Sequence, residues 1–416
     1  MTAALAASSP GVPQPPRGIR RLKITKVRVV EVRGIPTGKG LVMGFNMSKT
    51  EESRDYVVAQ FFTDQGLIGT TMDGEFSGGV AATAPGGIFQ LPAGIGKEIQ
   101  EIAESYFVGK DPFEIEVHAR EFFAQRKARM RLYFLEVALW DIIGKSLGEP
   151  LYRIWGASST KVATYAATLH FLKTPQQRAE DALRFHELGF RAIKLRFHKV
   201  DPLDDIALVR EVIKAAGSRM TIMVDANQSH KKMGDSPPVW DYDRAVRMAR
   251  ELEDLGVYWL EEPLHRSAFD DLARVRRQLT RMHLAGGEGN VGFEDFRQFV
   301  AKGSYSYIQP DPMIAGPVSV VRKIAAMAEA FGVLFGAHHG KSGVGMMANL
   351  HMQCAAPNSG YLEYPFDPGY WNPEGFQAGF AAPYPIDKSG YMHAPSGPGL
   401  GIEWDRTFFA KYGLQF

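Results

Sequence analysis

The first part of the chain changes its pattern of hydrophobic and polar positions once. From residue 22, hydrophobic and polar positions alternate through ITKVRVVEVRGI and YVVAQFFTDQGLIGT. DQG at residues 64–66 is typical of a tight turn between strands. From residue 97 to about residue 155, apolar residues recur at helical spacing until Gly148 and Pro150 interrupt them. The pattern predicts an antiparallel sheet followed by helices, which together form an α+β domain over residues 22–155.

A different rhythm begins near residue 156. Short apolar runs end in polar residues and alternate with amphipathic stretches that are expected to be helical. The runs are KVATYAATLH, AIKLRFH, TIMVDANQ, VYWLEEP, HLAGGE, SYIQPDP, LFGAHH and YLEY. The distance from the start of one run to the start of the next fits one strand and one crossover helix. Residues 156–365 are therefore predicted to form a closed parallel α/β barrel. Residues 366–416, rich in Gly, Pro, Tyr and Phe, leave this rhythm and are predicted to return to the first domain.

Composition narrows the possible partners and the compartment. Residues 1–21 are rich in Pro, Ala and Ser and lack both periodicity and the features of a secretion signal, so they are predicted to be a disordered leader. No apolar run reaches the roughly 18 residues of a membrane span. The 48 basic and 46 acidic residues nearly cancel and form no basic stripe, so neither a membrane nor a nucleic acid is expected as a partner. A single cysteine, Cys354, excludes an internal disulfide and fits a cytoplasmic protein.

Three carboxylates end consecutive runs of the predicted barrel. Because the carboxyl ends of barrel strands converge on one mouth, Asp225, Glu261 and Glu288 should face one point. Taken singly, each also fits an ordinary structural role, as an Asx turn, a strand exit before proline or a helix cap. Taken together, three ionised carboxylates would repel one another unless a cation lay between them. An all-oxygen ligand set favours Mg²⁺ over zinc or copper.

The sixth and seventh runs bring an acid close to two histidines. QPDP contains Asp311, and AHH contains His338 and His339. A carboxylate beside an imidazole fixes its tautomer and raises its basicity. A histidine bonded to a backbone carbonyl in the core is the alternative interpretation for either one alone.

The strand-end motifs KLR, VDAN, EEP, GGE, QPD, AHH and LEY, behind a domain that closes with ALWDIIGKSLGEPLYRIWG, together resemble the enolase superfamily, mandelate racemase subgroup. The resemblance covers nearly the whole chain after the leader. It implies a modified TIM-type (β/α)7β barrel with an α+β N-terminal capping domain, whose loops at residues 37–55 and 74–96 contribute to substrate specificity. It also implies Mg²⁺-dependent removal of the proton α to a carboxylate, through an enediolate.

The resemblance further implies roles for six strand-end residues. They are the metal ligands Asp225, Glu261 and Glu288, the dyad Asp311 and His338, and Glu363, which would hydrogen-bond the substrate carboxylate. His338 is preferred to His339 because its spacing from Asp311 suits the family. Side-chain alternation along a strand predicts that the two histidines point in opposite directions, and a bulge would reverse the choice.

One strand end departs from the family pattern. Members commonly have Lys-x-Lys, in which the second lysine exchanges the α proton, whereas this chain has Lys194 and Arg196. A guanidinium stays protonated and makes a poor base, although it supplies charge and hydrogen bonds. With His338 as the one evident acid/base, we expect dehydration of an acid sugar to a 2-keto-3-deoxy acid. His338 would act as base, as acid or as both, and Lys194 would abstract the proton if His338 were only the acid.

Other functions remain compatible with the sequence. A racemase, epimerase or cycloisomerase would use Lys194 as a second base, and a non-catalytic metal-binding barrel would explain Lys-x-Arg as lost catalysis. The candidate substrate contacts are Asn227, His198, His170 and His339. The resemblance also makes a homo-oligomer the expected state.

An insertion, SHKKMGDSPPVWDYD at residues 229–243, lengthens the step between the third and fourth runs. It is either a surface addition or a loop over the mouth. In the second case His230 or Lys231 would meet a second acidic group on the substrate.

Overall fold

The computed structural model describes residues 21–42, 50–74, 91–124, 131–169, 173–197, 199–231, 239–369 and 371–416. Almost all of the predicted leader, His170 and His198 lie outside the described residues. So do parts of the two predicted specificity loops and of the insertion. Among the described helices, none is both long and apolar enough to cross a membrane.

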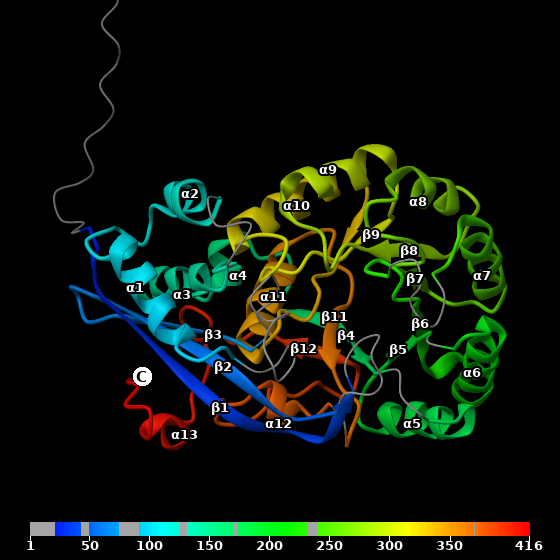
Figure 1. The fold of residues 1–416 in the computed structure, drawn as a ribbon, viewed down its shortest axis with the longest axis horizontal. Coiled ribbons are helices and arrows are strands. Elements are labelled where there is room, and N and C mark those ends of the chain that lie inside the picture. The colour runs from blue at the N-terminus through cyan, green and yellow to red at the C-terminus, as the bar shows by residue number, and fades with distance from the viewer. Residues whose placement is uncertain are drawn as a thin grey trace, which may run out of the picture.

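The N-terminal part is a three-stranded antiparallel sheet covered by helices (Figure 1). Its strands are β1 (Ile24–Val42), β2 (Thr50–Thr63) and β3 (Ile68–Asp73), and its helices are α1 (Ile95–Phe107), α2 (Ile115–His118), a π-helical segment (Ala119–Phe123), α3 (Leu135–Leu147) and α4 (Leu151–Ile154). Gly69 lets α3 pack closely on β3, because a Cβ there would lie 2.1 Å from the carbonyl oxygen of Ala138. Gly148 ends α3 in a left-handed conformation with φ of 70°, as the sequence predicts.

The following part alternates parallel strands with helices. The parallel strands are β4 (Lys161–Ala167), β5 (Ala192–Arg196), β6 (Thr221–Asp225), β7 (Trp259–Glu261), β8 (His283–Gly286), β9 (Tyr307–Ile308), β10 (Leu334–Phe335) and β11 (Leu362–Pro365). The helices between them are α5 (Pro175–Glu187), α6 (Pro202–Ala216), α7 (Tyr242–Asp254), α8 (Phe269–Arg276), α9 (Gly292–Lys302), α10 (Val318–Ala330) and α11 (Gly343–Ala355). The strand order is β10-β9-β8-β7-β6-β5-β4-β11, and an isolated bridge joins Phe335 of β10 to Ser359, three residues before β11. This arrangement agrees with the predicted (β/α)7β barrel.

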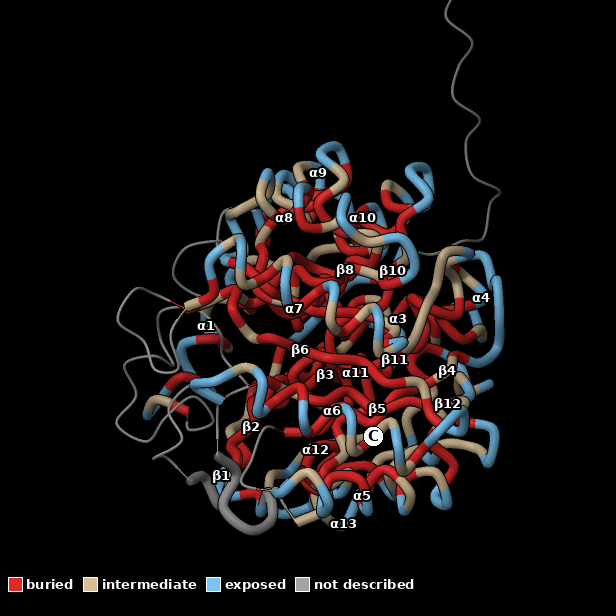
Figure 2. The backbone as a smooth tube through the Cα atoms, turned by 90° about the vertical axis from the view of Figure 1, so that its right-hand side faces the viewer, coloured by how far each residue is buried: buried red, intermediate tan, exposed pale blue. Residues whose placement is uncertain are grey.

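Local sequence signals position the helices that surround the barrel. Thr174 and Gln177 form a reciprocal capping box at the start of α5. Asp201 and Asp241 cap α6 and α7, where their side chains accept backbone N–H groups. Figure 2 shows the result, with buried backbone concentrated in the central strands and exposed positions on the outer helices.

The segment after β11 contacts both parts of the molecule. It contains α12 (Pro373–Phe376), β12 (Tyr391–His393) and α13 (Arg406–Ala410), and β12 pairs antiparallel with β4 of the barrel. Near the C-terminus, Arg28 Nη2 of the first sheet donates to the carbonyl of Tyr412 at 2.8 Å. The sequence pattern indicated only the contact with the first domain.

The end of the barrel at the amino ends of the strands is filled by large side chains, which we call the plug. Trp259 lies between Tyr165 and Tyr307, with ring centroids 5.1 and 4.8 Å away. Gly336 and Gly360 make room for this plug, because a Cβ on either would lie 2.3 Å from the hydroxyl oxygen of Tyr307. The interior is therefore packed at the amino ends of the strands, and polar side chains can face a space only at the carboxyl ends.

Glu136 connects the N-terminal domain to the barrel. Its carboxyl group accepts hydrogen bonds from the N–H (2.8 Å) and the hydroxyl (2.7 Å) of Ser319 at the start of α10. Burial raises the pKa of Glu136 to about 7, against its usual value of 4.5. The folded protein therefore holds this proton more tightly than the unfolded chain does.

We expect Glu136→Gln to change the pH dependence of stability. Because the folded pKa is raised, the stabilisation from proton uptake is complete below pH 4.5 and is lost as the pH rises through about 7. Relative to wild type, the variant should therefore gain about 1–3 kcal/mol between pH 5 and pH 8 in urea unfolding. Glu98→Gln, at an exposed position of α1, is the control. A stability difference that is the same at both pH values would contradict this account.

Candidate active site

Side-chain alternation relates the polar groups at the barrel mouth to the plug, because residues two positions apart on a strand face the same side. Plug residues on five strands are each followed, two positions later, by a polar residue at the mouth. The pairs are Ala192 and Lys194, Met223 and Asp225, Trp259 and Glu261, Tyr307 and Gln309, and Tyr361 and Glu363. The same alternation thus packs the lower end of the barrel and gathers buried polar groups at the upper end.

The three carboxylates predicted to bind metal lie together. Ligand atoms of Asp225, Glu261 and Glu288 are all within 4.8 Å of one another. Asp225 and Glu261 end β6 and β7, whereas Glu288 follows β8 after two glycines. Gly287 has φ of 115° and a Cβ there would lie 2.9 Å from the Phe296 ring, so this turn requires glycine.

Lys194 is completely buried among these acids. Its Nζ lies 3.0 Å from Glu261 Oε1, 3.0 Å from Glu363 Oε1 and 3.8 Å from Asp225 Oδ2. Burial alone would lower the pKa of Lys194, but Glu261 and Glu363 outweigh it and raise the pKa above its usual value. Burial and the neighbouring Asp225 raise the pKa of Glu261 to about 8 despite this ammonium group. The site therefore carries more negative charge than Lys194 neutralises.

Arg196 holds Asp225 in place. Its Nη1 donates to Asp225 Oδ2 at 2.7 Å, and its Nε donates to the carbonyl of Thr168 at 2.8 Å. Asn227, in a left-handed conformation with φ of 49°, donates its backbone and side-chain N–H groups to the same carboxylate, each at 2.8 Å. Burial opposes the charge of Arg196, but Asp225 outweighs it and raises the pKa, so the guanidinium stays protonated and is no base.

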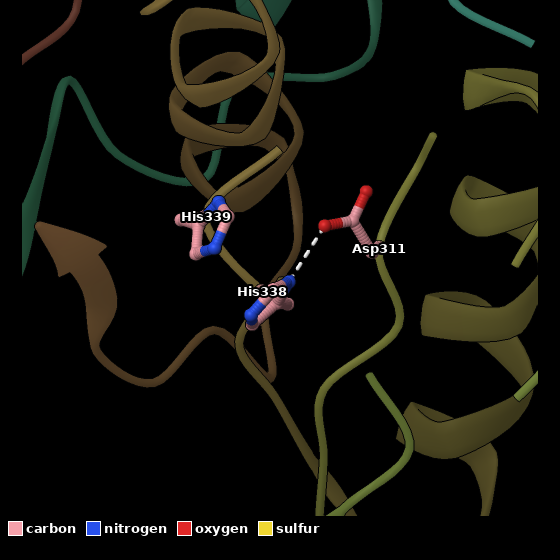
Figure 3. A group of neighbouring side chains, drawn as sticks. All are labelled: Asp311, His338 and His339. Carbon is pink, nitrogen blue, oxygen red and sulfur yellow. Dashed lines mark hydrogen bonds and ion pairs between the residues drawn. The ribbon is translucent and has the colours of Figure 1, made fainter. Parts of the chain in front are cut away.

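His338 and Asp311 form a hydrogen-bonded pair (Figure 3), with Nδ1 of His338 2.7 Å from Asp311 Oδ2. The Asp311 carboxylate also accepts the N–H of Met313 at 2.7 Å, so it acts as an acceptor and Nδ1 carries the shared proton. The other ring nitrogen, Nε2, faces Glu288 Oε2 at 3.3 Å and Glu363 Oε2 at 3.8 Å. Burial lowers the pKa of His338, but Glu288 and Glu363 outweigh it and raise the pKa. The carboxylates around Nε2 therefore favour a proton on this nitrogen, and His338 is placed to hold or release a proton at the mouth.

The prediction that His338 and His339 point in opposite directions is wrong. β10 ends at Phe335, so both histidines lie beyond the strand, and their ring centroids are 3.9 Å apart (Figure 3). His339 also packs against Trp371 at 5.2 Å, and its Nδ1 accepts the N–H of Lys341. Burial, reinforced by the neighbouring His338, lowers the pKa of His339 well below its usual value, so this ring is neutral.

One polar residue at the site, Gln309, was not singled out from the sequence, and Glu262 was expected to point away from the metal ligands by side-chain alternation. Gln309 donates to Glu261 Oε2 at 3.0 Å, and alternation from Tyr307 would have identified it. Glu262 is buried, accepts the hydroxyl of Ser229 at 2.5 Å, and has φ of 46°. Burial and Glu288 raise the pKa of Glu262 well above its usual value. Glu262 lies directly after β7 and has a positive φ, so the periodicity of the strand does not predict where its side chain points.

Arg196→Met should destabilise the metal-free protein by about 3–5 kcal/mol, because it leaves a buried carboxylate without its partner. Urea unfolding in a chelator measures this. Arg274→Met is the matched control, since Arg274 forms an exposed ion pair with Asp271 at 2.7 Å and should change stability by less than about 1 kcal/mol. Equal effects of the two substitutions would contradict the assigned role of Arg196.

Family models match both parts of the chain. The model of the mandelate racemase/muconate lactonizing enzyme N-terminal domain matches residues 27–156, and the enolase C-terminal domain-like model matches residues 177–408. The chain therefore belongs to the enolase superfamily, in the mandelate racemase subgroup.

Similar curated proteins act on acid sugars. The chain is 28% identical to arabinonate dehydratase of Saccharolobus solfataricus, over 67% of this chain and 70% of that protein. It is 27% identical to D-xylonate dehydratase of Haloferax volcanii, over 96% and 91%. It is 31% identical to 3,6-anhydro-alpha-L-galactonate cycloisomerase of Streptomyces coelicolor, over 65% and 68%. These similarities indicate an enzyme of the acid-sugar dehydratase and cycloisomerase group.

Solved structures share the fold over nearly the whole chain. A member of the enolase superfamily from Polaromonas sp. JS666 is 26% identical with a TM-score of 0.76, covering 94% of this chain and 97% of that one. A racemase from Streptomyces coelicolor A3(2), solved with bound magnesium, is 24% identical with a TM-score of 0.75, covering 93% and 99%. The barrel and the capping domain are therefore the architecture of this superfamily.

Proposed function

We propose that the protein is an Mg²⁺-dependent hydro-lyase that dehydrates an acid sugar to a 2-keto-3-deoxy acid. The observation that carries this proposal is that, among the described residues, one histidine paired with a carboxylate lies at the mouth and no second lysine follows Lys194 on its strand. His338 is paired with Asp311, whereas Arg196 occupies the position of a second base and is bonded to Asp225. Relatives that are dehydratases support the same reaction class.

The proposed ligands of the ion are Asp225, Glu261 and Glu288. Their oxygen atoms lie within 4.8 Å of one another, and hard oxygen donors suit Mg²⁺. Neighbouring groups hold the carboxylates in place, as metal ligands require. Arg196 contacts Asp225, and Gln309 contacts Glu261. A bound Mg²⁺ would supply Lewis-acid stabilisation of negative charge on the substrate carboxylate.

In the proposed mechanism, Nε2 of His338 removes the proton from C2 and the C–H electron pair forms the enediolate. The ammonium group of Lys194 stabilises the added charge. Glu363, 3.0 Å from Lys194, orients that ammonium group. Burial raises the pKa of Glu363, but Lys194 and His338 outweigh it and lower the pKa, so the carboxylate accepts hydrogen bonds.

The same imidazole then completes the elimination. The enediolate electrons form the C2–C3 double bond as the C3–O bond breaks, and His338 returns its proton to the departing hydroxyl, which leaves as water. The enol product ketonises to the 2-keto-3-deoxy acid. One base that also serves as the acid accounts for the reaction without a second group opposite it.

A screen of acid sugars with Mg²⁺ tests this reaction. We expect a 2-keto-3-deoxy product from at least one acid, no C2 epimer, and a loss of about 10²–10⁴-fold in kcat in His338→Asn. His393→Asn is the control, because His393 pairs with Asp387 on the surface, at 2.8 Å. Epimerisation without dehydration would contradict the proposal and favour Lys194 as a second base. Metal binding without turnover of any acid would favour a non-catalytic barrel.

Cycloisomerisation is a second candidate reaction, favoured by the 31% identity to a cycloisomerase. It would use the same proton abstraction, but the oxygen that leaves C3 would belong to a ring of the substrate, so the C3–O bond breaks, the ring opens and no water is lost. Its product has the mass of the substrate, whereas dehydration removes one water, so mass spectrometry of the products separates the two.

Magnesium should bind once per chain and stabilise the fold. Titration calorimetry on chelator-treated protein measures the stoichiometry, and Mg²⁺ at 100 times its Kd should add about 2.7 kcal/mol to the unfolding free energy. Asp225→Asn and Glu288→Gln should each weaken binding at least about tenfold. Asp270→Asn, an exposed position, is the control. Unchanged Mg²⁺ affinity in both site variants would contradict the assigned ligands.

A further inference from the structure

A basic group lies beside the proposed metal ligands and has no part in the mechanism above. Arg266, which follows β7, donates through Nη1 to the carbonyl of Gly289 at 3.0 Å, directly after Glu288. The same nitrogen lies 3.2 Å from Nδ1 of His230. A Cβ on Gly289 would lie 2.3 Å from the His230 ring and 3.1 Å from Arg266 Nη1. Glycine at this position is what lets both basic side chains lie against the backbone.

His230 lies between the Arg266 guanidinium and Glu288 at the barrel mouth. Because Nδ1 accepts from Arg266, the neutral ring carries its proton on Nε2, which lies 3.9 Å from Glu288 Oε1. A single imidazole ring therefore separates Arg266 from a proposed metal ligand.

Arg131 adds a second guanidinium from the capping domain. Within the part of the chain that the structure describes, its Nε has no hydrogen-bond partner, and no carboxylate forms an ion pair with Arg131 or Arg266. Burial lowers the pKa of Arg131, Tyr133 opposes this, and the nearby Arg266 lowers the pKa further. Both arginines are partly buried and neither is paired with a carboxylate among the described residues, so an anion bound by them would be stabilised.

We propose that Arg266, together with Arg131 and His230, binds a second anionic group at the far end of the substrate, so that the preferred substrate is a dicarboxylic acid sugar. This inference rests on the proposed function and specifies its substrate class. The first carboxylate is held at the metal and Lys194, and the distal carboxylate accepts hydrogen bonds from the two guanidinium groups. A terminal phosphate ester would share this chemistry. Because the guanidinium fork binds carboxylate and phosphate in the same bidentate way, we assign the carboxylate and include a phosphate ester among the ligands tested below.

Binding measured without turnover tests the subsite. The experiment uses the full-length His338→Asn protein with Mg²⁺ and titration calorimetry. Its ligands are a panel of six-carbon sugar diacids, the matched monoacids and 6-phosphogluconate. We expect the best diacid to bind at least about tenfold more tightly than its monoacid. Adding Arg266→Gln or Arg131→Gln should weaken diacid binding about 10- to 100-fold and monoacid binding less than about threefold.

Control variants separate this result from misfolding and from failure of the proposed reaction. Arg274→Gln should leave both affinities unchanged, and Arg266→Lys should restore part of the diacid preference because it keeps the charge. Equal binding of diacids and monoacids in the parent, or equal losses for both in Arg266→Gln, would overturn the proposal. Tightest binding of 6-phosphogluconate would overturn the assignment of a carboxylate. A protein that selects diacids yet dehydrates none would refute the proposed reaction and leave this subsite standing.

Discussion

Buried negative charge at the barrel mouth is the constraint on which the site depends. Asp225, Glu261 and Glu363 are fully buried, and a carboxylate oxygen of Glu288 lies within 4.8 Å of those of Asp225 and Glu261. Bringing carboxylates out of water costs several kcal/mol each unless cations compensate. Lys194 and Arg196 supply part of this compensation. Burial and the acidic neighbours still raise the pKa of Glu261 to about 8, so its negative charge is not fully compensated. A divalent cation among these carboxylates would complete the charge balance.

The fold connects this site to the docking of the capping domain. The loop that carries Asp311 leads into α10, whose first turn donates to Glu136 of the cap. The loop that carries His338 leads into α11, where Ser342 donates its hydroxyl to the carbonyl of Met72 in β3 at 2.7 Å. Both members of the proposed dyad therefore precede helices whose starts are fixed by the cap. Substitutions at this interface should disturb the alignment of Asp311 and His338 even though they lie outside the mouth.

The sequence predicted the elements and residues that depend on local periodicity. The convergence of strand ends on one mouth predicted that Asp225, Glu261 and Glu288 would lie together, and the structure brings their ligand atoms within 4.8 Å of one another. The prediction for His338 and His339 was wrong because β10 ends at Phe335, three residues before His338, and side-chain alternation does not extend so far beyond a strand. The neighbourhood of Arg131 and Arg266 could not be predicted, since it brings together residues from the cap and the barrel that no periodicity relates.

The most direct test of the central claim follows the proton at C2 in D₂O with Mg²⁺ and a turned-over acid sugar. If His338 alone exchanges this proton, recovered substrate contains deuterium only with retained configuration, and His338→Asn shows no exchange. The account predicts this result. Exchange that persists in His338→Asn, or deuterium in an epimerised substrate, would show a second base, with Lys194 the nearest candidate, and would contradict the one-base mechanism.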